Sequence, residues 1–374
     1  MNLWIAGASI TDFGELWNRS LFDLLEEASL GAVAQAQIPA EDIEAVFVAN
    51  MGAGAFEGQL HLGAVVSSFF SHFPPAMRVE GACASGGLAL LAAEQAILSG
   101  QYKTVLVVGA EKMTDISAEQ ATAVLSGAAC QHSECGSTFP GLYALLAQQH
   151  MQQYGTTREH LSAVSAKNHR HALNNPHAQY QKEITVQAVS ESAMIAEPLR
   201  LLDCSPLSDG AAAVVLSSER VANDNPRITG FGQGNDSLSL AKRSSLTSFV
   251  ATQRAAQQAY SLSGKQVQDF PVMEVHDCFT IAELLALEDL GVFAPGEAGS
   301  ATLARETTYG GKVVVNPSGG LKACGHPVGA TGVKQVAYLA QLLREGQYER
   351  ALAHNVGGSG ATAVVHILEA GEES

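Results

Sequence analysis

The feature that most constrains this chain is the alternation of short apolar segments with longer helical ones. Residues 3–8, 45–49 and 105–108 have the length and composition of buried strands. Between them, residues 20–37 and 84–98 are typical of helices. This alternation predicts an α/β fold in which helices cover a sheet. Only 16% of the residues are charged and 47% are hydrophobic, which favours a sheet that is buried on both faces.

A second α/β block begins at residue 227. Its expected strands and helices, in chain order, are residues 227–231, 248–260, 272–275, 280–290, 328–344, 352–354 and 361–368. Both blocks share one order of elements, a strand, a helix, a strand, helical sequence and then two strands, which indicates an internal duplication. We therefore predict an N-terminal half, residues 1–221, and a C-terminal half, residues 227–374, joined by a polar linker.

Residues 113–203 differ in character from both blocks. Gln, His, Ser and Tyr become frequent there and strand signals nearly vanish, while residues 142–153 and 158–172 look helical. We expect this stretch to be an insertion in the first half that lies over the sheet.

The formal net charge of −16 argues against binding to nucleic acid or to an anionic membrane. It does not exclude an anionic substrate such as coenzyme A, because a helix N-terminus can hold phosphate locally. No apolar run is long enough to span a bilayer, and the N-terminus does not resemble a signal peptide. We expect a cytoplasmic protein with reduced thiols.

The six cysteines show no Cys-x-x-Cys spacing, so neither a zinc ribbon nor a disulfide framework is indicated. Cys130 and Cys135 flank His132, which would make at most a weak metal site because no fourth ligand is evident. We expect no metal and no permanently bound cofactor.

Cys83 lies in a turn of small residues, after a short strand and at the start of a helix. The helix N-terminus carries partial positive charge and favours the thiolate, and small neighbours leave room for a thioester. A thiolate is the nucleophile in acyl transfer. The alternative, for a lone cysteine the commoner one, is a small residue of the core.

Three later segments carry further polar groups in loops. His326 leaves a glycine-rich loop just before a proline that suits the first turn of a helix, where an imidazole can activate a thiol. His276 and Cys278 share a short loop between a strand and a helix. Gly357 belongs to a glycine-rich turn whose N–H groups could line an oxyanion hole. Each segment alone also has an ordinary structural explanation.

Taken together and in this order, the four segments resemble the thiolase superfamily, and within it the sterol-carrier-type and archaeal acetoacetyl-CoA thiolases. General thiolases have an Asn-Glu-Ala-Phe loop where this chain has His-Asp-Cys-Phe at 276–279, and a cysteine at the position of Asn355. The sterol-carrier type moves that second cysteine into the loop, as here. The resemblance implies a thiolase fold. Two duplicated αβαβαββ-type halves would form a five-layered α-β-α-β-α arrangement, with a loop-domain insertion in the first half.

The resemblance also implies roles for individual residues. Cys83 would attack the acyl thioester and become acylated, and His326 would take its proton and later help to bind the enolate oxygen. Cys278 would be the base for the α-carbon of the second thioester, and His276 would replace the usual asparagine of an oxyanion site. The N–H groups of Cys83 and Gly357 would form the other oxyanion hole.

The function implied is that of an acyl-CoA C-acyltransferase that makes or cleaves a 3-ketoacyl-CoA such as acetoacetyl-CoA. Two alternatives stay open: a related acyltransferase with an acceptor other than coenzyme A, and a non-catalytic subunit of a complex. The family also suggests a homodimer or tetramer and a small OB-fold partner with a zinc ribbon that helps to hold the cofactor. Cys324, two residues before His326, is expected to be packed rather than reactive.

Overall fold

The computed structural model describes residues 3–371, whose principal strands fall into two groups of five. The N-terminal half contributes β1 (Trp4–Ile10), β2 (Ala45–Ala49), β3 (Ala76–Val79), β4 (Thr104–Glu111) and β7 (Gly210–Ser217). The C-terminal half contributes β8 (Arg227–Asn235), β9 (Val272–Glu274), β10 (Val314–Val315), β11 (Arg350–Gly357) and β12 (Thr362–Glu369).

The two groups of strands have the same topology. Their orders are β3-β2-β4-β7-β1 and β10-β9-β11-β12-β8, so each runs third, second, fourth, fifth, first. The first three strands of each group pair in parallel and the other two antiparallel. The two groups of strands join into one continuous sheet through β1 and β8, where Trp4 pairs with Arg227.

Helices follow the same division. The N-terminal half has α1 (Leu21–Ala36), α2 (Ala53–Phe56), α3 (Leu62–Ser67) and α4 (Ser85–Leu98). The C-terminal half has α9 (Val250–Ser263), α10 (Thr280–Asp289), α11 (Ala298–Leu303), α12 (Gly320–Cys324) and α13 (Thr331–Arg344). The insertion has α5 (Ala118–Ser126), α6 (Phe139–Tyr154), α7 (Arg158–Ala172) and α8 (Val186–Glu191), and the small hairpin of β5 (Met194–Ala196) and β6 (Leu199–Arg200).

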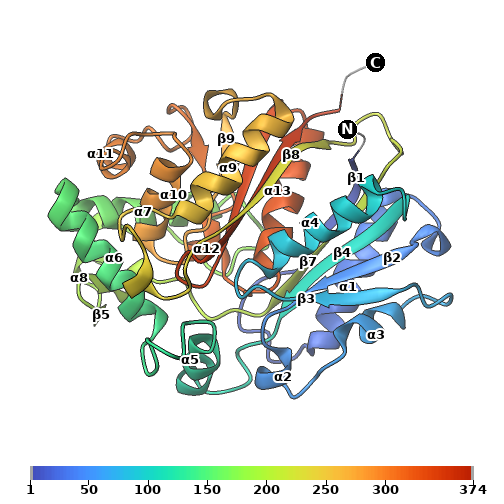
Figure 1. Cartoon of the computed structure of the whole chain (residues 1–374), viewed down its shortest axis with the longest axis horizontal. Coiled ribbons are helices and arrows are strands. Elements are labelled where there is room, and N and C mark those ends of the chain that lie inside the picture. The colour runs from blue at the N-terminus through green and yellow to red at the C-terminus, as the bar shows by residue number, and fades with distance from the viewer. Residues whose placement is uncertain (1–2, 372–374) are drawn as a thin grey trace.

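Alternating side chains on the strands build the layers. In β4, Val105 and Val107 point into a central core that also holds α4, α13 and strands of the other half. Leu106 and Val108 point the opposite way, into a core with α1 and α3. The outer face of the second half packs against α9 and α10. The five layers α-β-α-β-α of the thiolase fold are therefore confirmed, with α4 and α13 in the middle of the molecule (Figure 1).

The insertion covers the second half of the molecule, although it belongs to the first half of the chain. Leu142 and Leu146 of α6 and Leu161 of α7 share one core with Leu284 of α10. Figure 1 shows these green helices beside the orange C-terminal ones. The insertion thereby reaches a site that both halves form.

Sequence patterns did not predict the shortest elements. The strand β10 has two residues, and α2, α5, α8, α11 and α12 are all short. Periodicity is a weak signal in elements of this length, because they are shorter than the window of about 11–18 residues in which a helical pattern can be recognised. No helix within residues 3–371 is long and apolar enough to cross a bilayer.

Candidate active site

Cys83 occupies a tight turn between β3 and α4. The preceding residue, Ala82, has a φ of +53°, a left-handed conformation that costs a residue other than glycine about 1–2 kcal/mol. Ser85 holds the turn, because its hydroxyl accepts from the N–H of Gly81 at 3.0 Å and donates to the carbonyl of Ala82 at 2.6 Å. The thiol is therefore presented from a fixed and strained backbone.

The end of β11 packs directly on this turn. A side chain at Gly357 would collide with the carbonyl oxygen of Gly81 and crowd Ala84, so the close approach requires glycine. The N–H of the next residue, Gly358, faces the sulfur of Cys83 and lowers the pKa of its thiol. Gly358 was not predicted as a site residue, and the proposed role of Gly357 in the oxyanion hole stays a prediction.

Burial controls the protonation of Cys83. Removal from water raises the pKa of the thiol to about 12, although the N–H groups of Gly358 and of Cys83 itself act in the opposite direction. The position near a helix N-terminus led us to expect a thiolate, but α4 begins only at Ser85 and burial outweighs its field. The resting group is a neutral thiol, so a nucleophilic role would require a base that takes its proton.

His326 lies beside this thiol and is the candidate for such a base. Its Nδ1 lies 2.7 Å from the hydroxyl oxygen of Thr331, whose own proton is donated to the carbonyl of Pro327 at 3.2 Å. With the hydroxyl proton directed to Pro327, we assign the ring proton of His326 to Nδ1, which leaves a lone pair on Nε2. Burial, with a smaller contribution from Lys334, lowers the pKa of His326 to about 3, so the imidazole is neutral at physiological pH.

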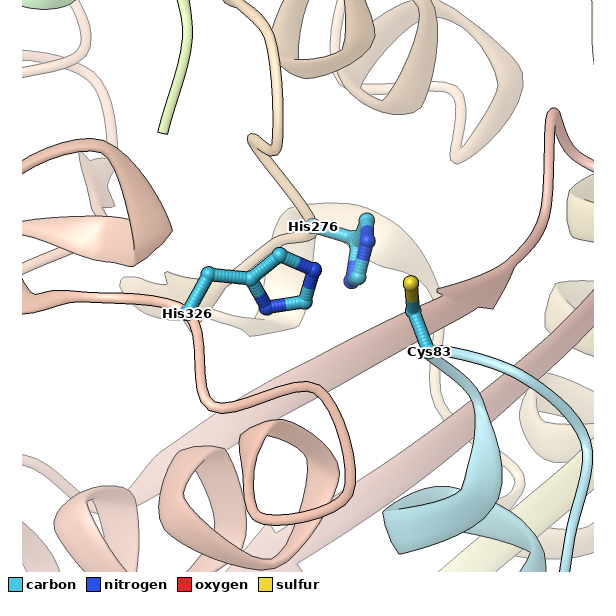
Figure 2. A group of neighbouring side chains, drawn as sticks. All are labelled: Cys83, His276 and His326. Carbon is cyan, nitrogen blue, oxygen red and sulfur yellow. The ribbon is translucent and has the colours of Figure 1, made fainter. Parts of the chain in front are cut away.

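The two histidines and Cys83 converge on one point. Cys83 Sγ and one ring nitrogen from each of His276 and His326 all lie within 4.8 Å of one another. The two rings stand at 84° with centroids 5.2 Å apart. Figure 2 shows the three side chains pointing toward one another from three separate loops. Nε2 of each histidine is buried and has no hydrogen-bond partner among residues 3–371, so both are free to contact a substrate.

Cys278 lies on the wall of the same cavity as Cys83. Burial and the nearby Cys83 raise the pKa of the Cys278 thiol well above its usual range, whereas a hydrogen bond with Tyr143 lowers it. In the resting site, the one proton of the Tyr143 hydroxyl is donated to the carbonyl of Gly358 at 3.1 Å. Tyr143 comes from the insertion, and no local sequence pattern marked it as a site residue.

The cavity has a volume of about 190 Å³. Apart from the thiols and His326, its wall is largely apolar, with Met113, Leu125, Phe139, Phe279 and Val328 among its lining residues. Such a lining suits the hydrocarbon part of an acyl group rather than a charged one.

Buried polar contacts fix the loop that carries His276 and Cys278. The carboxylate of Asp277 accepts from the N–H groups of Leu321 and Lys322 at 2.6 and 3.2 Å and from the amide of Asn168 at 2.6 Å. These bonds tie the loop to α12 and to the insertion. This structural role of Asp277 was not predicted, because its partners lie far away along the chain.

Other candidate positions lie apart from the cavity. Cys324 is fully buried and accepts a hydrogen bond from Asn175 at 3.3 Å, as a packed residue would. Cys130, His132 and Cys135 form no ligand group, since within residues 3–371 the group of Cys83, His276 and His326 alone has metal-ligand spacing. Its donor types, one thiol and two imidazoles, are those that zinc uses.

Comparisons with known proteins agree with this geometry. The family model described as "Thiolase, N-terminal domain" matches residues 3–220, and "Thiolase C-terminal domain-like" matches residues 232–370. Acetyl-CoA acetyltransferase of Methanothermobacter thermautotrophicus is 45% identical over 97% of this chain and 98% of its own. Sterol carrier protein 2 of Homo sapiens is 33% identical over 97% of this chain and 71% of its own.

Solved structures show the same fold at lower identity. The structure described as "Ltp2-ChsH2(DUF35) aldolase" has a TM-score of 0.84 at 24% identity and covers 100% of this chain and 99% of its own. Human mitochondrial 3-ketoacyl-CoA thiolase in complex with CoA has a TM-score of 0.77 at 18% identity, with 98% of each chain covered.

The fold is that of an acyltransferase of the thiolase type, and Cys83, His276 and His326 are its candidate site residues. The chain belongs to the thiolase family. Its activity is that of a thiolase, the making or cleaving of a 3-ketoacyl-CoA, and this excludes the non-catalytic alternative.

Proposed function

We propose that Cys83 carries the acyl group. As its sulfur attacks the thioester carbon, Nε2 of His326 takes the thiol proton. The negative oxygen lies at the N–H groups of Cys83 and of Gly357 or Gly358. When the bond to coenzyme A breaks, the leaving thiolate takes the proton of Cys278. Acylated Cys83, a protonated His326 and a Cys278 thiolate remain, and the two opposite charges compensate each other in the buried site.

In the second half-reaction, the Cys278 thiolate removes a proton from the α-carbon of a second acyl-CoA. The enolate oxygen accepts hydrogen bonds from His276 and His326, and the α-carbon attacks the acyl carbon on Cys83. The bond from sulfur to carbon breaks, and the Cys83 thiolate takes back its proton from His326. Every group returns to its starting state, and coenzyme A serves as a substrate carrier rather than as a bound cofactor.

The observation that carries this proposal is the convergence of Cys83 Sγ and both imidazoles within 4.8 Å, with Cys278 on the wall of the same cavity. Nucleophile, base, donor and second thiol are the four groups that the reaction needs. The buried surroundings strengthen each electrostatic interaction because water does not screen them.

We propose acetyl groups as the preferred acyl groups, so that the product of condensation is acetoacetyl-CoA. The name of the relative with 45% identity, acetyl-CoA acetyltransferase, supports this choice. The cavity of about 190 Å³ also agrees with a short acyl chain. The protein would then supply or consume a four-carbon unit in lipid metabolism in the cytoplasm.

We further propose two halves, residues 1–221 and 227–374, within an oligomer. Identical strand orders support the two halves. The edge strand β3, with Met77 54% exposed, supports pairing with a second copy.

A small OB-fold protein with a zinc ribbon is the proposed partner for holding coenzyme A. A fold neighbour described with two component names, one marked DUF35, is compatible with a partner.

The experiment is a panel of 3-ketoacyl-CoA substrates of increasing chain length, assayed for cleavage by coenzyme A with and without the candidate partner. We expect kcat/KM to be largest for acetoacetyl-CoA. A maximum at long chains would contradict the acetyl preference, and no cleavage under either condition would contradict the proposed activity.

A further inference from the structure

Asn355 lies on β11 behind the site, and its amide contacts three elements of it. The side chain is 2% exposed. Its Oδ1 accepts from the N–H of Gly87 in α4 at 3.0 Å, and its Nδ2 donates to the carbonyl of Cys83 at 2.9 Å. The same Nδ2 lies 3.2 Å from Nδ1 of His276.

These contacts fix which way the amide points. The N–H of Gly87 can only donate and the carbonyl of Cys83 can only accept, so the oxygen and nitrogen of Asn355 cannot exchange places. Nδ2 has two protons, of which one goes to Cys83 and the other points at His276. Nδ1 of His276 must therefore be an acceptor.

An acceptor at Nδ1 determines the rest of the His276 ring. Burial and the neighbouring His326 hold the pKa of His276 well below its usual range, so the ring is neutral and carries one proton. That proton is on Nε2, which is the buried nitrogen without a hydrogen-bond partner among the described residues. His276 is thus a hydrogen-bond donor toward the substrate.

His326 has the opposite arrangement. Its Nδ1 carries the proton and donates to Thr331, so its Nε2 presents a lone pair. Two chemically identical rings, 5.2 Å apart, are therefore held in complementary states by two different neighbours.

We propose that Asn355 is a positioning residue that makes His276 the hydrogen-bond donor of the site and leaves His326 as its base. The functional part of this inference rests on the proposed role of His276 at the enolate oxygen. If both rings presented lone pairs, they would repel that oxygen instead of stabilising it.

The same arrangement disfavours a metal at this cluster. A metal bound through Nδ1 would need the lone pair that accepts from Asn355, and a metal bound through Nε2 would require the ring proton to move to Nδ1. There the N–H of the ring would face the N–H of Asn355, and neither could accept. Donor types and spacing suit zinc, but the tautomer of His276 does not.

The direct test is the tautomer itself. Long-range ¹H–¹⁵N NMR of histidine-labelled protein separates protonated from unprotonated ring nitrogens, and comparison with the His276→Asn variant identifies the signals of His276. We expect Nε2 protonated and Nδ1 unprotonated in the wild-type protein at pH 7. Protonation of Nδ1 instead would overturn the proposal without any variant of Asn355.

A substitution of the same size tests causation. Asn355→Asp keeps the acceptor for Gly87 but presents oxygen to His276, so the ring proton should move from Nε2 to Nδ1. The control is Asn175→Asp, at a second asparagine that is also 2% exposed but contacts Ser318 and Cys324 instead. It should leave the His276 signals unchanged.

Kinetics tests whether Asn355 acts through His276. Loss of one oxyanion donor lowers kcat by about 100-fold or more, so Asn355→Asp and His276→Phe, which leaves no donor at position 276, should each reduce condensation about 100-fold. The double variant should be no slower than the slower single variant, because both remove the same donor. Costs that multiply to about 10⁴-fold would show that Asn355 acts independently of His276 and would overturn the proposal. If Asn355→Asp does not fold, the tautomer of His276 in the NMR spectrum of the wild-type protein still tests the proposal.

Discussion

The two halves of the molecule share one strand order but contribute different chemistry. After β3, the short turn of residues 80–84 leads into α4 and presents Cys83. At the equivalent place after β10, the longer segment of residues 316–330 contains α12, leads into α13 and presents His326. The nucleophile is fixed by a strained turn, whereas the base reaches the site on a long loop held by hydrogen bonds.

The loops after β2 and β9 differ in the same way. After β2, Asn50 donates to the carboxylate of Glu111 at 2.8 Å, which is a structural contact. After β9, the equivalent loop carries His276 and Cys278 into the site. In the proposed mechanism, the first half therefore supplies the nucleophile, while the second half supplies the groups that move protons and stabilise charge. A duplicated fold brings both sets together because α4 and α13 lie side by side in the central layer.

The largest effect should come from replacing Cys83, the one catalytic side chain that we propose for the first half. We expect Cys83→Ala to lower acyl transfer by at least about 10⁴-fold, since the covalent route is lost. The control is Cys135→Ala, which removes an exposed thiol outside the cavity and should leave the activity unchanged. Cleavage of acetoacetyl-CoA by coenzyme A is the assay, and substantial activity of Cys83→Ala would show that another group is the nucleophile.

A second variant separates the half-reactions. Cys278→Ala should lower condensation by about 10³-fold, within the range for loss of a general base, while acylation of Cys83 remains detectable. Rates of condensation and of acyl-enzyme formation are measured side by side. If condensation stays at the wild-type rate, Cys278 is not the base for the α-carbon.

Each half also contains a buried ion pair that can be compared directly. Lys112 lies 2.8 Å from Asp209 in the first half, and Lys334 lies 3.0 Å from Glu274 in the second. Either lysine changed to methionine leaves a buried carboxylate without its partner, which should lower the free energy of unfolding by about 3–5 kcal/mol. Urea unfolding measures the change.

The matched control for this comparison is the double variant Lys334→Met with Glu274→Gln. It removes both charges and should recover part of the lost stability. A loss of less than about 1 kcal/mol for Lys334→Met alone would contradict the picture of a tightly paired interior.

The smallest effect concerns pH. Burial lowers the pKa of His326 and of His354 to about 3, against an ordinary value of 6.5. Each binds fewer protons folded than unfolded below pH 6.5, so the free energy of unfolding should fall as pH drops, by about 1 kcal/mol per histidine between pH 6.5 and 5.5. In contrast to these buried histidines of the second half, the two histidines of the first half that precede the insertion, His61 and His72, are exposed.

Denaturant titrations at pH 7.5, 6.5 and 5.5 would measure this loss. In His354→Gln, the free energy of unfolding should depend less steeply on pH. The difference should equal the contribution of one histidine, because glutamine does not titrate. A slope that does not change in His354→Gln would mean that acid sensitivity arises elsewhere in the molecule.

Much of the fold could be predicted because long elements carry full periods of the apolar pattern. The helix expected at residues 158–172 was found at Arg158–Ala172. The site loops were also recognisable, since a cysteine before a helix and a histidine in a glycine-rich loop are local patterns. Tyr143 was not predictable, because the insertion brings it across to the second half only in three dimensions. Nor were the tautomers, which depend on the long-range contact between Asn355 and His276 and on the orientation of Thr331.

The most direct test of the account is peptide mass spectrometry of the Cys278→Ala variant after incubation with acetyl-CoA. This variant should form the acyl enzyme but fail to consume it, so the acetyl group should accumulate. We predict the mass of one acetyl group on the peptide that contains Cys83, and none when Cys83 is also changed to alanine. An acetyl group on a different cysteine, or no modification together with active wild-type enzyme, would contradict the assignment of Cys83 as the nucleophile.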